Sequence, residues 1–166
     1  MKRTLTILTA LLITTHSSFA LETLQEPAKS CPLKTLKDGK SLSLESLKGK
    51  VIYLDFWASW CGPCALSFPF MTEVAKKHKA EGLELVAISV DESREEAEAF
   101  LNSHPTNFTV VHDPNGDCPK VYGLETMPTS YLIDRKGNLR EVHRGFSNSD
   151  RQELSKAIDS LLKEKP

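Results

Sequence analysis

The chain has 166 residues, of which 40% are hydrophobic, and a formal net charge of −1 at pH 7. This length suits one globular domain with an adequate core, so the four cysteines are not needed as staples for a core that is too small. A charge this close to zero offers no electrostatic attraction to nucleic acid or to an anionic membrane surface.

The first 20 residues have the pattern of a secretory signal peptide. A basic pair, Lys2 and Arg3, precedes an apolar run over 5–13, and in Ser18-Phe19-Ala20 small residues stand at the two positions that a signal peptidase reads, with cleavage after Ala20. The alternative is an uncleaved anchor, but a membrane-spanning helix needs ~20 mostly apolar residues, and this run is shorter and contains threonines. We therefore expect a mature chain of residues 21–166 that is periplasmic or secreted and soluble after cleavage.

The mature segment begins with the pattern of a small hairpin. Asp38-Gly39 separates the apolar segments Leu33–Leu36 and Leu42–Leu44, which predicts two short strands joined by a turn. Five later segments have the continuous apolar or alternating pattern of strands, namely Val51–Trp57, Leu83–Val90, Phe108–His112, Ser130–Ile133 and Leu139–His143.

Three segments between and after these strands have helical patterns. The first covers residues 62–80, and the second, Ser93–Ser103, opens with a capping box formed by Ser93 and Glu96. The last opens at Ser149-x-x-Gln152 and places its apolar residues on one face. Alternation of this kind predicts an α/β fold with a mostly parallel sheet flanked by helices.

Cys61 and Cys64 stand where the first long strand gives way to the first helix. At this spacing the two cysteines share one helical turn, close enough to exchange between dithiol and disulfide. The helix N-terminus favours a thiolate at Cys61, and a thiolate there is a nucleophile. Two alternatives remain open: half of a zinc site, although Cys31 and Cys118 do not form a second pair, and a purely structural disulfide, although a short loop gains least from cross-linking.

The chain resembles the thioredoxin superfamily, and in particular its exported TlpA-like and ResA-like thiol–disulfide oxidoreductases. Residues 60–64, Trp-Cys-Gly-Pro-Cys, match the active-site pentad, and Pro69 stands where the family bends its active-site helix. Thr-Met-Pro-Thr at 126–129 is similar to the cis-proline loop. The resemblance covers about residues 33–163 and implies a thioredoxin-like fold, with a central mixed sheet flanked by helices and an N-terminal β-hairpin extension.

The resemblance implies a role for each residue of the site. Cys61 would be the attacking thiolate and Cys64 the buried resolving thiol, while Trp60 forms the aromatic wall of the site. Pro128 would be cis and leave the backbone of Met127 free to pair with a substrate strand. The substrate-binding positions are then Trp60, Gly62, Pro63, Met127 and Pro128.

Asp55 lies inside an apolar strand, six residues before Cys61. Burial should raise its pKa, and the resemblance assigns this position to the acid/base that assists deprotonation of the resolving cysteine. The alternative is an ordinary carboxylate at a strand end, bound to solvent or to a backbone amide. Two positions depart from related proteins: Ser67 replaces an acidic residue common in TlpA-like proteins, and Ala87 stands where cytosolic thioredoxins pair the buried aspartate with a lysine.

The remaining histidines and cysteines suggest no cofactor and no metal. His78 is expected to be a solvated helix residue, and none of the histidines has metal-ligand spacing with the cysteines. A copper-binding metallochaperone of the same fold is the alternative function, although such proteins typically use Cys-x-x-x-Cys. A peroxidase of this fold would lack the cysteine pair. Cys31 and Cys118 are predicted to form a structural disulfide, with two buried free thiols as the alternative.

The expected function is reduction of disulfides in exported proteins through the Cys-x-x-Cys dithiol. Cytochrome c maturation is one role that the resemblance implies, and general disulfide repair is another. The expected partners are a disulfide-containing protein substrate and a membrane-embedded thiol reductant, and the protein is expected to be monomeric. Gly62-Pro63 is the thioredoxin dipeptide and no histidine lies between the cysteines, so the protein should act as a reductant.

Overall fold

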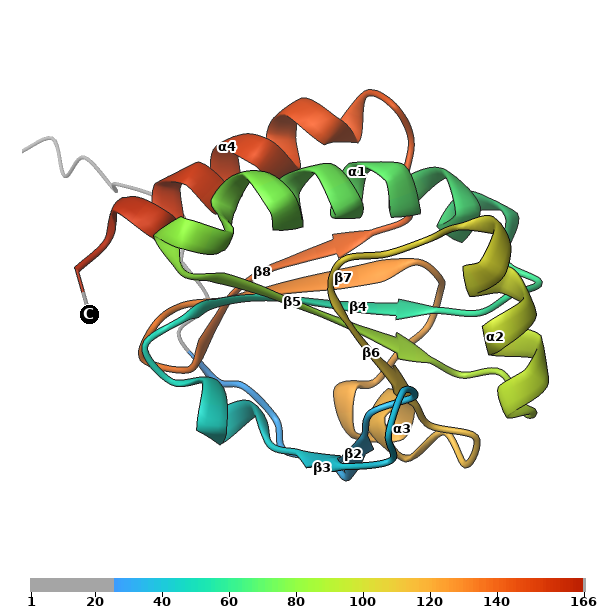
Figure 1. The fold of residues 1–166 in the computed structure, drawn as a ribbon. Coiled ribbons are helices and arrows are strands. Elements are labelled where there is room, and N and C mark those ends of the chain that lie inside the picture. The colour runs from blue at the N-terminus through green and yellow to red at the C-terminus, as the bar shows by residue number, and fades with distance from the viewer. Residues whose placement is uncertain (1–25, 166) are drawn as a thin grey trace, which may run out of the picture.

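The computed structural model describes residues 26–165 as one α/β domain (Figure 1). The predicted signal peptide, residues 1–20, lies outside the described residues. The strands are β1 (Glu26–Pro27), β2 (Leu33–Lys34), β3 (Ser41–Leu42), β4 (Val51–Trp57), β5 (Leu83–Ser89), β6 (Thr109–His112), β7 (Thr129–Ile133) and β8 (Asn138–Arg144). The α-helices are α1 (Gly62–His78), α2 (Arg94–Ser103), α3 (Asp117–Tyr122) and α4 (Asp150–Lys163), and the short 3-10 helices are Leu44–Leu47 and Lys79–Glu81.

The central sheet has the strand order β1-β8-β7-β4-β5-β6. Strands β4, β5 and β6 run parallel, whereas β7, β8 and β1 pair in antiparallel fashion. The prediction of a mostly parallel sheet is therefore wrong, and the mixed sheet implied by the resemblance is confirmed. The physical reason is visible in the link 134–137, which is a tight turn between β7 and β8, because parallel neighbours would need a crossover of a dozen residues or more.

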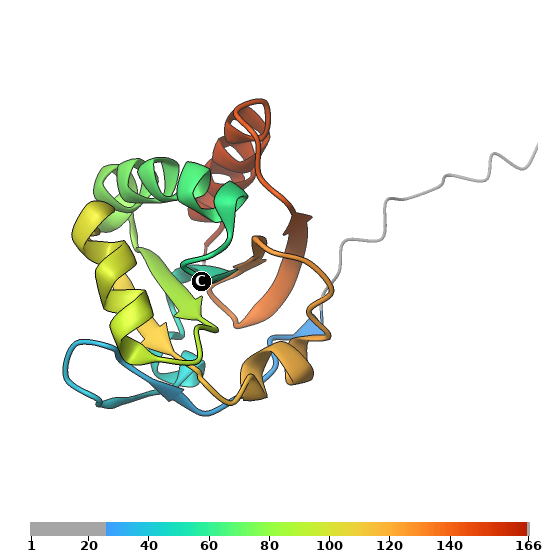
Figure 2. The same ribbon diagram turned by 90° about the vertical axis from the view of Figure 1, so that its right-hand side faces the viewer.

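Helices cover the two faces of the sheet unequally. Figure 1 shows α1 and α4 lying side by side over one face, and Figure 2 shows α2 beside the edge strand β6. The opposite face carries α3 and the N-terminal segment with its β2–β3 hairpin. The hairpin matches the prediction, and its turn is held by a hydrogen bond of 2.5 Å from Thr35 Oγ1 to Asp38 Oδ1.

Strand β4 forms the middle of the core, and all seven of its residues are buried. Successive side chains of a strand point to opposite faces. Val51, Tyr53 and Trp57 pack with α1 and α4, whereas the alternate residues pack on the side of α3. Asp55 has the parity of Tyr53 and Trp57, so its side chain lies on the face covered by α1.

The N-terminal ends of α2 and α4 can be compared with the capping patterns predicted from the sequence. The capping box of α2 is confirmed: Ser93 Oγ accepts from the Glu96 amide at 3.2 Å, and Glu96 Oε2 accepts from the Ser93 amide at 3.3 Å. The predicted start of the last helix is confirmed, since Ser149 is the N-cap of α4, but the Ser149 side chain makes no capping hydrogen bond within the described part of the chain. Instead, Asp150 Oδ2 accepts from the amide and the hydroxyl of Ser147.

His78 at the end of α1 also differs from expectation. Its side chain is only 2% exposed and is not a solvated helix residue. Nδ1 lies 2.9 Å from Glu81 Oε1, and Nε2 lies 3.5 Å from Asp159 Oδ1 on α4. The pattern of α1 did not reveal this burial because it depends on how α4 packs against α1.

Between residues 26 and 165, every helix is too short or too polar to cross a membrane.

Candidate active site

The cysteine pair lies where β4 ends and α1 begins, at the right-hand side of Figure 1. Cys61 is the N-cap of α1 and Cys64 lies in its first turn. The two are joined as a disulfide with a Cα–Cα distance of 5.2 Å, so the structure holds the oxidised form. Cys61 is 6% exposed and Cys64 is fully buried, so a large partner can approach only the first sulfur.

The backbone around Cys61 is arranged to receive negative charge on sulfur. The amide of Cys64 donates to Cys61 Sγ at 3.3 Å, which makes the sulfur the acceptor that caps the helix. The free amides and the dipole of a helix N-terminus both stabilise an anion. This is the environment that lowers the pKa of a cysteine thiol and makes it a nucleophile.

A groove beside the disulfide brings together residues distant in sequence. Residues 60–63 form one wall, residues 124–127 form the other, and the volume between them is about 490 Å³. Trp60 is 69% exposed at the rim. The groove thus collects four of the five predicted substrate-binding positions, namely Trp60, Gly62, Pro63 and Met127.

Pro128, the fifth position, is buried and follows this wall in the chain without lining the groove. The Met127–Pro128 peptide bond is cis, as the resemblance implied. The carbonyl of Pro128 accepts a hydrogen bond of 2.7 Å from the amide of Gly145, which fixes the loop to the residue after β8. Met127 is partly buried against the core on the α1 side of the sheet.

Asp55 is fully buried beneath this region, so it is not a solvated carboxylate at a strand end. Its Oδ1 accepts a hydrogen bond of 2.7 Å from Ser130 Oγ, and its Oδ2 has no hydrogen-bond partner among residues 26–165. Burial raises the pKa of the Asp55 carboxyl from 3.8 to about 7, while the hydrogen bond from Ser130 acts in the opposite direction. Ala87 lies directly opposite Asp55 on β5, as the sequence register predicted.

Ser130 and Tyr53 were not identified from the sequence as part of this site. Ser130 is 3% exposed on β7 in register with Asp55, and its Oγ lies 3.0 Å from Tyr53 Oη. A signal existed: Ser130 is a polar residue in an apolar strand, and Tyr53 precedes Asp55 by two residues on the same face. The pairing of β7 with β4 was needed to connect them.

Ser67, which replaces an acidic residue of related proteins, is buried on the next turn of α1. Its hydroxyl donates to the Cys64 carbonyl at 2.9 Å. The side chain is therefore satisfied within the helix and brings no charge to the cysteine pair.

Cys31 and Cys118 are joined in the structure, with their Cα atoms 5.3 Å apart. Cys118 is fully buried in α3, and its amide donates to Asp113 Oδ2 at 2.8 Å. The Tyr122 hydroxyl at the end of α3 donates to the Lys29 carbonyl at 2.8 Å. The disulfide and this hydrogen bond attach the N-terminal segment to the helix that leads into the groove wall 124–127.

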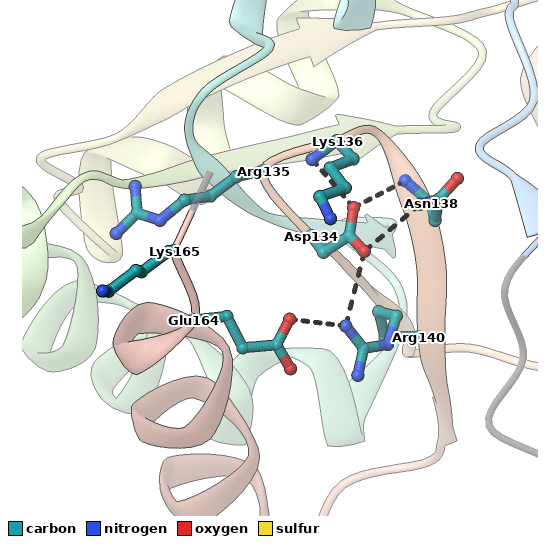
Figure 3. A pocket seen from close by; sticks show the side chains of 7 residues that line it. All are labelled: Asp134, Arg135, Lys136, Asn138, Arg140, Glu164 and Lys165. Carbon is teal, nitrogen blue, oxygen red and sulfur yellow. Dashed lines mark hydrogen bonds and ion pairs between the residues drawn. The ribbon is translucent and has the colours of Figure 1, made fainter.

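A second pocket lies at the opposite end of β7 (Figure 3). Asp134, Arg140 and Glu164 meet there: Arg140 Nη1 lies 2.7 Å from Glu164 Oε2 and 3.4 Å from Asp134 Oδ2. These ion pairs connect the β7–β8 turn to the end of α4. Its lining includes no cysteine, serine or histidine, and its Asp134 and Glu164 carboxylates pair with Arg140, so we interpret it as a structural clamp. Across residues 26–165, no three His, Cys, Asp or Glu side chains are grouped to hold a metal ion.

Comparisons with known proteins agree with this geometry. The model of the Redoxin family matches residues 23–161. The chain is 34% identical to thiol-disulfide oxidoreductase ResA of Bacillus cereus over 137 residues, which are 81% of this chain and 79% of that protein. ResA of Bacillus subtilis is 38% identical over 108 residues, 65% of this chain and 60% of that protein.

Solved structures show the same similarity. A Chlorobium tepidum protein described as a thiol:disulfide interchange protein DsbE superposes with a TM-score of 0.80 at 42% identity, over 84% of this chain and 97% of that one. The MTB protein DsbF, solved in mixed oxidised and reduced forms, superposes with a TM-score of 0.70 at 31% identity, over 79% of this chain and 94% of that one.

Proposed function

Because this chain belongs to the Redoxin family of the thioredoxin superfamily and is a thiol–disulfide oxidoreductase, we propose that it reduces disulfides of extracytoplasmic proteins. One observation carries the proposal. Cys61, at a helix N-terminus, reaches the surface beside a groove, while its partner Cys64 is fully buried. An accessible nucleophile with a protected second thiol suits a two-step exchange on a large substrate.

In the first step, the Cys61 thiolate of the reduced protein attacks one sulfur of the substrate disulfide. A bond forms between Cys61 and that sulfur, the substrate disulfide breaks, and the other substrate sulfur leaves as a thiolate. The Cys64 amide and the helix dipole stabilise the attacking thiolate.

In the second step, Cys64 attacks Cys61 Sγ in the mixed disulfide. The Cys64 thiol first passes its proton to the Asp55 carboxylate, and the resulting thiolate forms the Cys61–Cys64 disulfide. The remaining substrate sulfur leaves as a thiolate and is protonated, so the substrate gains two electrons. A carboxyl with a pKa of about 7 is matched to proton transfer near neutral pH.

The groove supplies the binding surface for these steps. Trp60 and Pro63 offer apolar contacts on one wall, and the backbone of Met127 on the other is available to pair with an extended substrate segment. Binding along the loop would place the substrate disulfide beside Cys61. Monomeric action is sufficient, because one chain supplies both walls.

Residues 1–20 are proposed to act as a cleaved signal peptide that exports domain 21–166 to the periplasm or beyond. The Cys31–Cys118 disulfide supports this location, since such bonds persist in oxidising compartments. Electrons must then come from elsewhere, because each reduction leaves Cys61–Cys64 oxidised. A membrane-embedded thiol reductant is the proposed source.

Trapping of substrates tests this function. A Cys64→Ser protein keeps the nucleophile but loses the resolving thiol, so mixed disulfides through Cys61 should accumulate in the periplasmic fraction and be identified by mass spectrometry. Apocytochrome c among the adducts would indicate cytochrome c maturation, whereas a broad set of secreted proteins would indicate general disulfide repair.

The matched control is Cys61→Ser, which retains the buried thiol and should trap little or nothing. Adducts that form with Cys61→Ser but not with Cys64→Ser would reverse the two roles. Their absence from both variants would contradict the proposed function.

A further inference from the structure

We infer that Ser130 and Tyr53 are positioning residues, forming a relay of hydroxyl groups that orients the Asp55 carboxyl for its proton exchange with the cysteine pair. The inference rests on the proposed role of Asp55 as acid/base. Ala87 stands where cytosolic thioredoxins have a lysine that pairs with the buried aspartate, so residues of β4 and β7 would position Asp55 here instead.

The three groups are held together by the sheet itself. Tyr53 and Asp55 lie two residues apart on β4 and so face the same side, and Ser130 on β7 is in antiparallel register with Asp55. Ser130 Oγ lies 2.7 Å from Asp55 Oδ1 and 3.0 Å from Tyr53 Oη. Tyr53 and Asp55 are fully buried, and Ser130 is 3% exposed.

The donors and acceptors of these three side chains set the direction of the hydrogen bonds between them. The Ser130 hydroxyl has one proton and two acceptor lone pairs, and an ionised carboxylate can only accept. The serine proton must therefore point to Asp55 Oδ1, and the Tyr53 hydroxyl must donate to Ser130 Oγ. The reverse order would leave the carboxylate oxygen without a donor in a buried site, which is costly.

The direction of these hydrogen bonds gives the two carboxyl oxygens of Asp55 different roles. Oδ1 is occupied by Ser130, whereas Oδ2 has no partner within the described chain. Oδ2 is therefore the oxygen that takes up and releases the proton. The carboxyl cannot rotate to exchange the two oxygens without breaking the Ser130 hydrogen bond.

The elements packed around Asp55 place few other charged residues near its carboxyl group. Strand β5 presents Ala87, and α1 contributes Cys64 and Cys61 to the same core. Burial raises the pKa of Tyr53, Asp55 raises it further, and Glu141 on β8 adds a smaller contribution in the same direction, so the tyrosine remains a neutral donor. The Ser130 hydrogen bond is the contact that favours the charged form of Asp55 against burial.

The test is the pKa of Asp55 in the full mature protein, measured by NMR from the side-chain carboxyl carbon of ¹³C-labelled aspartate in the oxidised state, with Asp55→Asn to assign the signal. Wild type should titrate near 7. Ser130→Ala should raise the pKa by about one to two pH units, because it removes a hydrogen bond to a charged group. Tyr53→Phe should raise it by less, since it only weakens the serine as a donor.

Two further variants separate the relay from general damage to the core. Ser130→Thr keeps the hydroxyl and should titrate close to wild type. Ser89→Ala removes another buried strand hydroxyl, which donates to Asp91 at 2.8 Å, and should leave the Asp55 pKa unchanged. A pKa in Ser130→Ala equal to or below that of wild type would overturn the relay.

Failure of the proposed acid/base role has a different signature. That role predicts that Asp55→Asn slows resolution of a preformed mixed disulfide at Cys61 at least tenfold. If Asp55→Asn resolves at the wild-type rate while Ser130→Ala still raises the pKa, the role of Asp55 in the reaction is wrong and the hydrogen-bonded relay stands.

Discussion

A carboxyl group that is removed from water is harder to ionise, and Asp55 carries this cost inside the most buried strand of the protein. Its pKa of about 7 lies some three units above the value of 3.8 for an exposed aspartate. Each unit corresponds to 1.36 kcal/mol of preference for the protonated form. Ionising Asp55 in the folded protein therefore costs about 4 kcal/mol of stability, as an upper figure.

This cost predicts how stability depends on pH. Between about pH 4 and pH 7 the folded state binds a proton at Asp55 that the unfolded state does not, so this residue makes stability fall as pH rises through that window. Asp55→Asn removes the titration. The variant should gain stability over wild type at pH 8 relative to the same comparison at pH 4, by up to about 4 kcal/mol.

Urea unfolding of the oxidised proteins at both pH values measures this difference. An equal difference in stability at pH 4 and pH 8 would show that Asp55 is not buried with a raised pKa. Asp38, whose pKa is lowered to about 2 by hydrogen bonds with Lys40 and Thr35, supplies a control: Asp38→Asn should show no gain at pH 8 over pH 4.

Among the individual residues of the site, the cysteines and Asp55 could be identified from the sequence, but Ser130 could not. An acidic residue within an apolar run is visible in one segment, and so is a Cys-x-x-Cys motif. The contact of Ser130 with Asp55 joins residues 75 positions apart and depends on the antiparallel register of β7 with β4. A single strand does not encode its register with another.

Among the elements, those with a clear pattern were predicted well, including the short β2–β3 hairpin and strands β6 and β7, whereas two short elements without such a pattern were missed. Strands β4 and β5 and helices α1 and α2 lie where the sequence places them, within a few residues. The structure adds β1 and α3, which have two and six residues and are too short to show periodicity. Helix α3 is held instead by Asp113, which caps its first amides, and by the disulfide at Cys118.

Helix α2 allows a test of how much its capping box contributes to the stability of the protein. Its capping box satisfies amides that would otherwise lack partners at the helix start. Ser93→Ala should lower the free energy of unfolding by about 1 kcal/mol. Ser103→Ala, an exposed position in the last turn of the same helix, should change it by less than about 0.5 kcal/mol. Chemical denaturation checks both, and equal effects would contradict the assigned cap.

For the whole molecule, the two disulfides occupy different environments and serve different ends. Cys61–Cys64 lies beside the groove, whereas Cys31–Cys118 joins residues 87 positions apart and attaches the N-terminal segment to α3. Closing a loop of that length stabilises the folded chain by about 4 to 5 kcal/mol in the chain-entropy model. We expect Cys31–Cys118 to stay oxidised while Cys61–Cys64 alternates between disulfide and dithiol.

The surroundings of Cys61 indicate the expected direction of electron transfer. Gly62-Pro63 separates the cysteines without a histidine, and Asp55 adds a negative charge above about pH 7, so we expect only moderate stabilisation of a Cys61 thiolate. A moderately stabilised thiolate favours giving electrons away, with a potential nearer to the roughly −270 mV of thioredoxin than to the roughly −120 mV of DsbA.

Equilibration of the mature protein with glutathione buffers, followed by alkylation of free thiols and mass spectrometry, measures both disulfides at once. Cys61–Cys64 should open in the more reducing buffers while Cys31–Cys118 stays closed, because Cys118 is fully buried in the folded protein. A potential of Cys61–Cys64 near −120 mV would make the protein an oxidant, and opening of Cys31–Cys118 first would contradict its structural role.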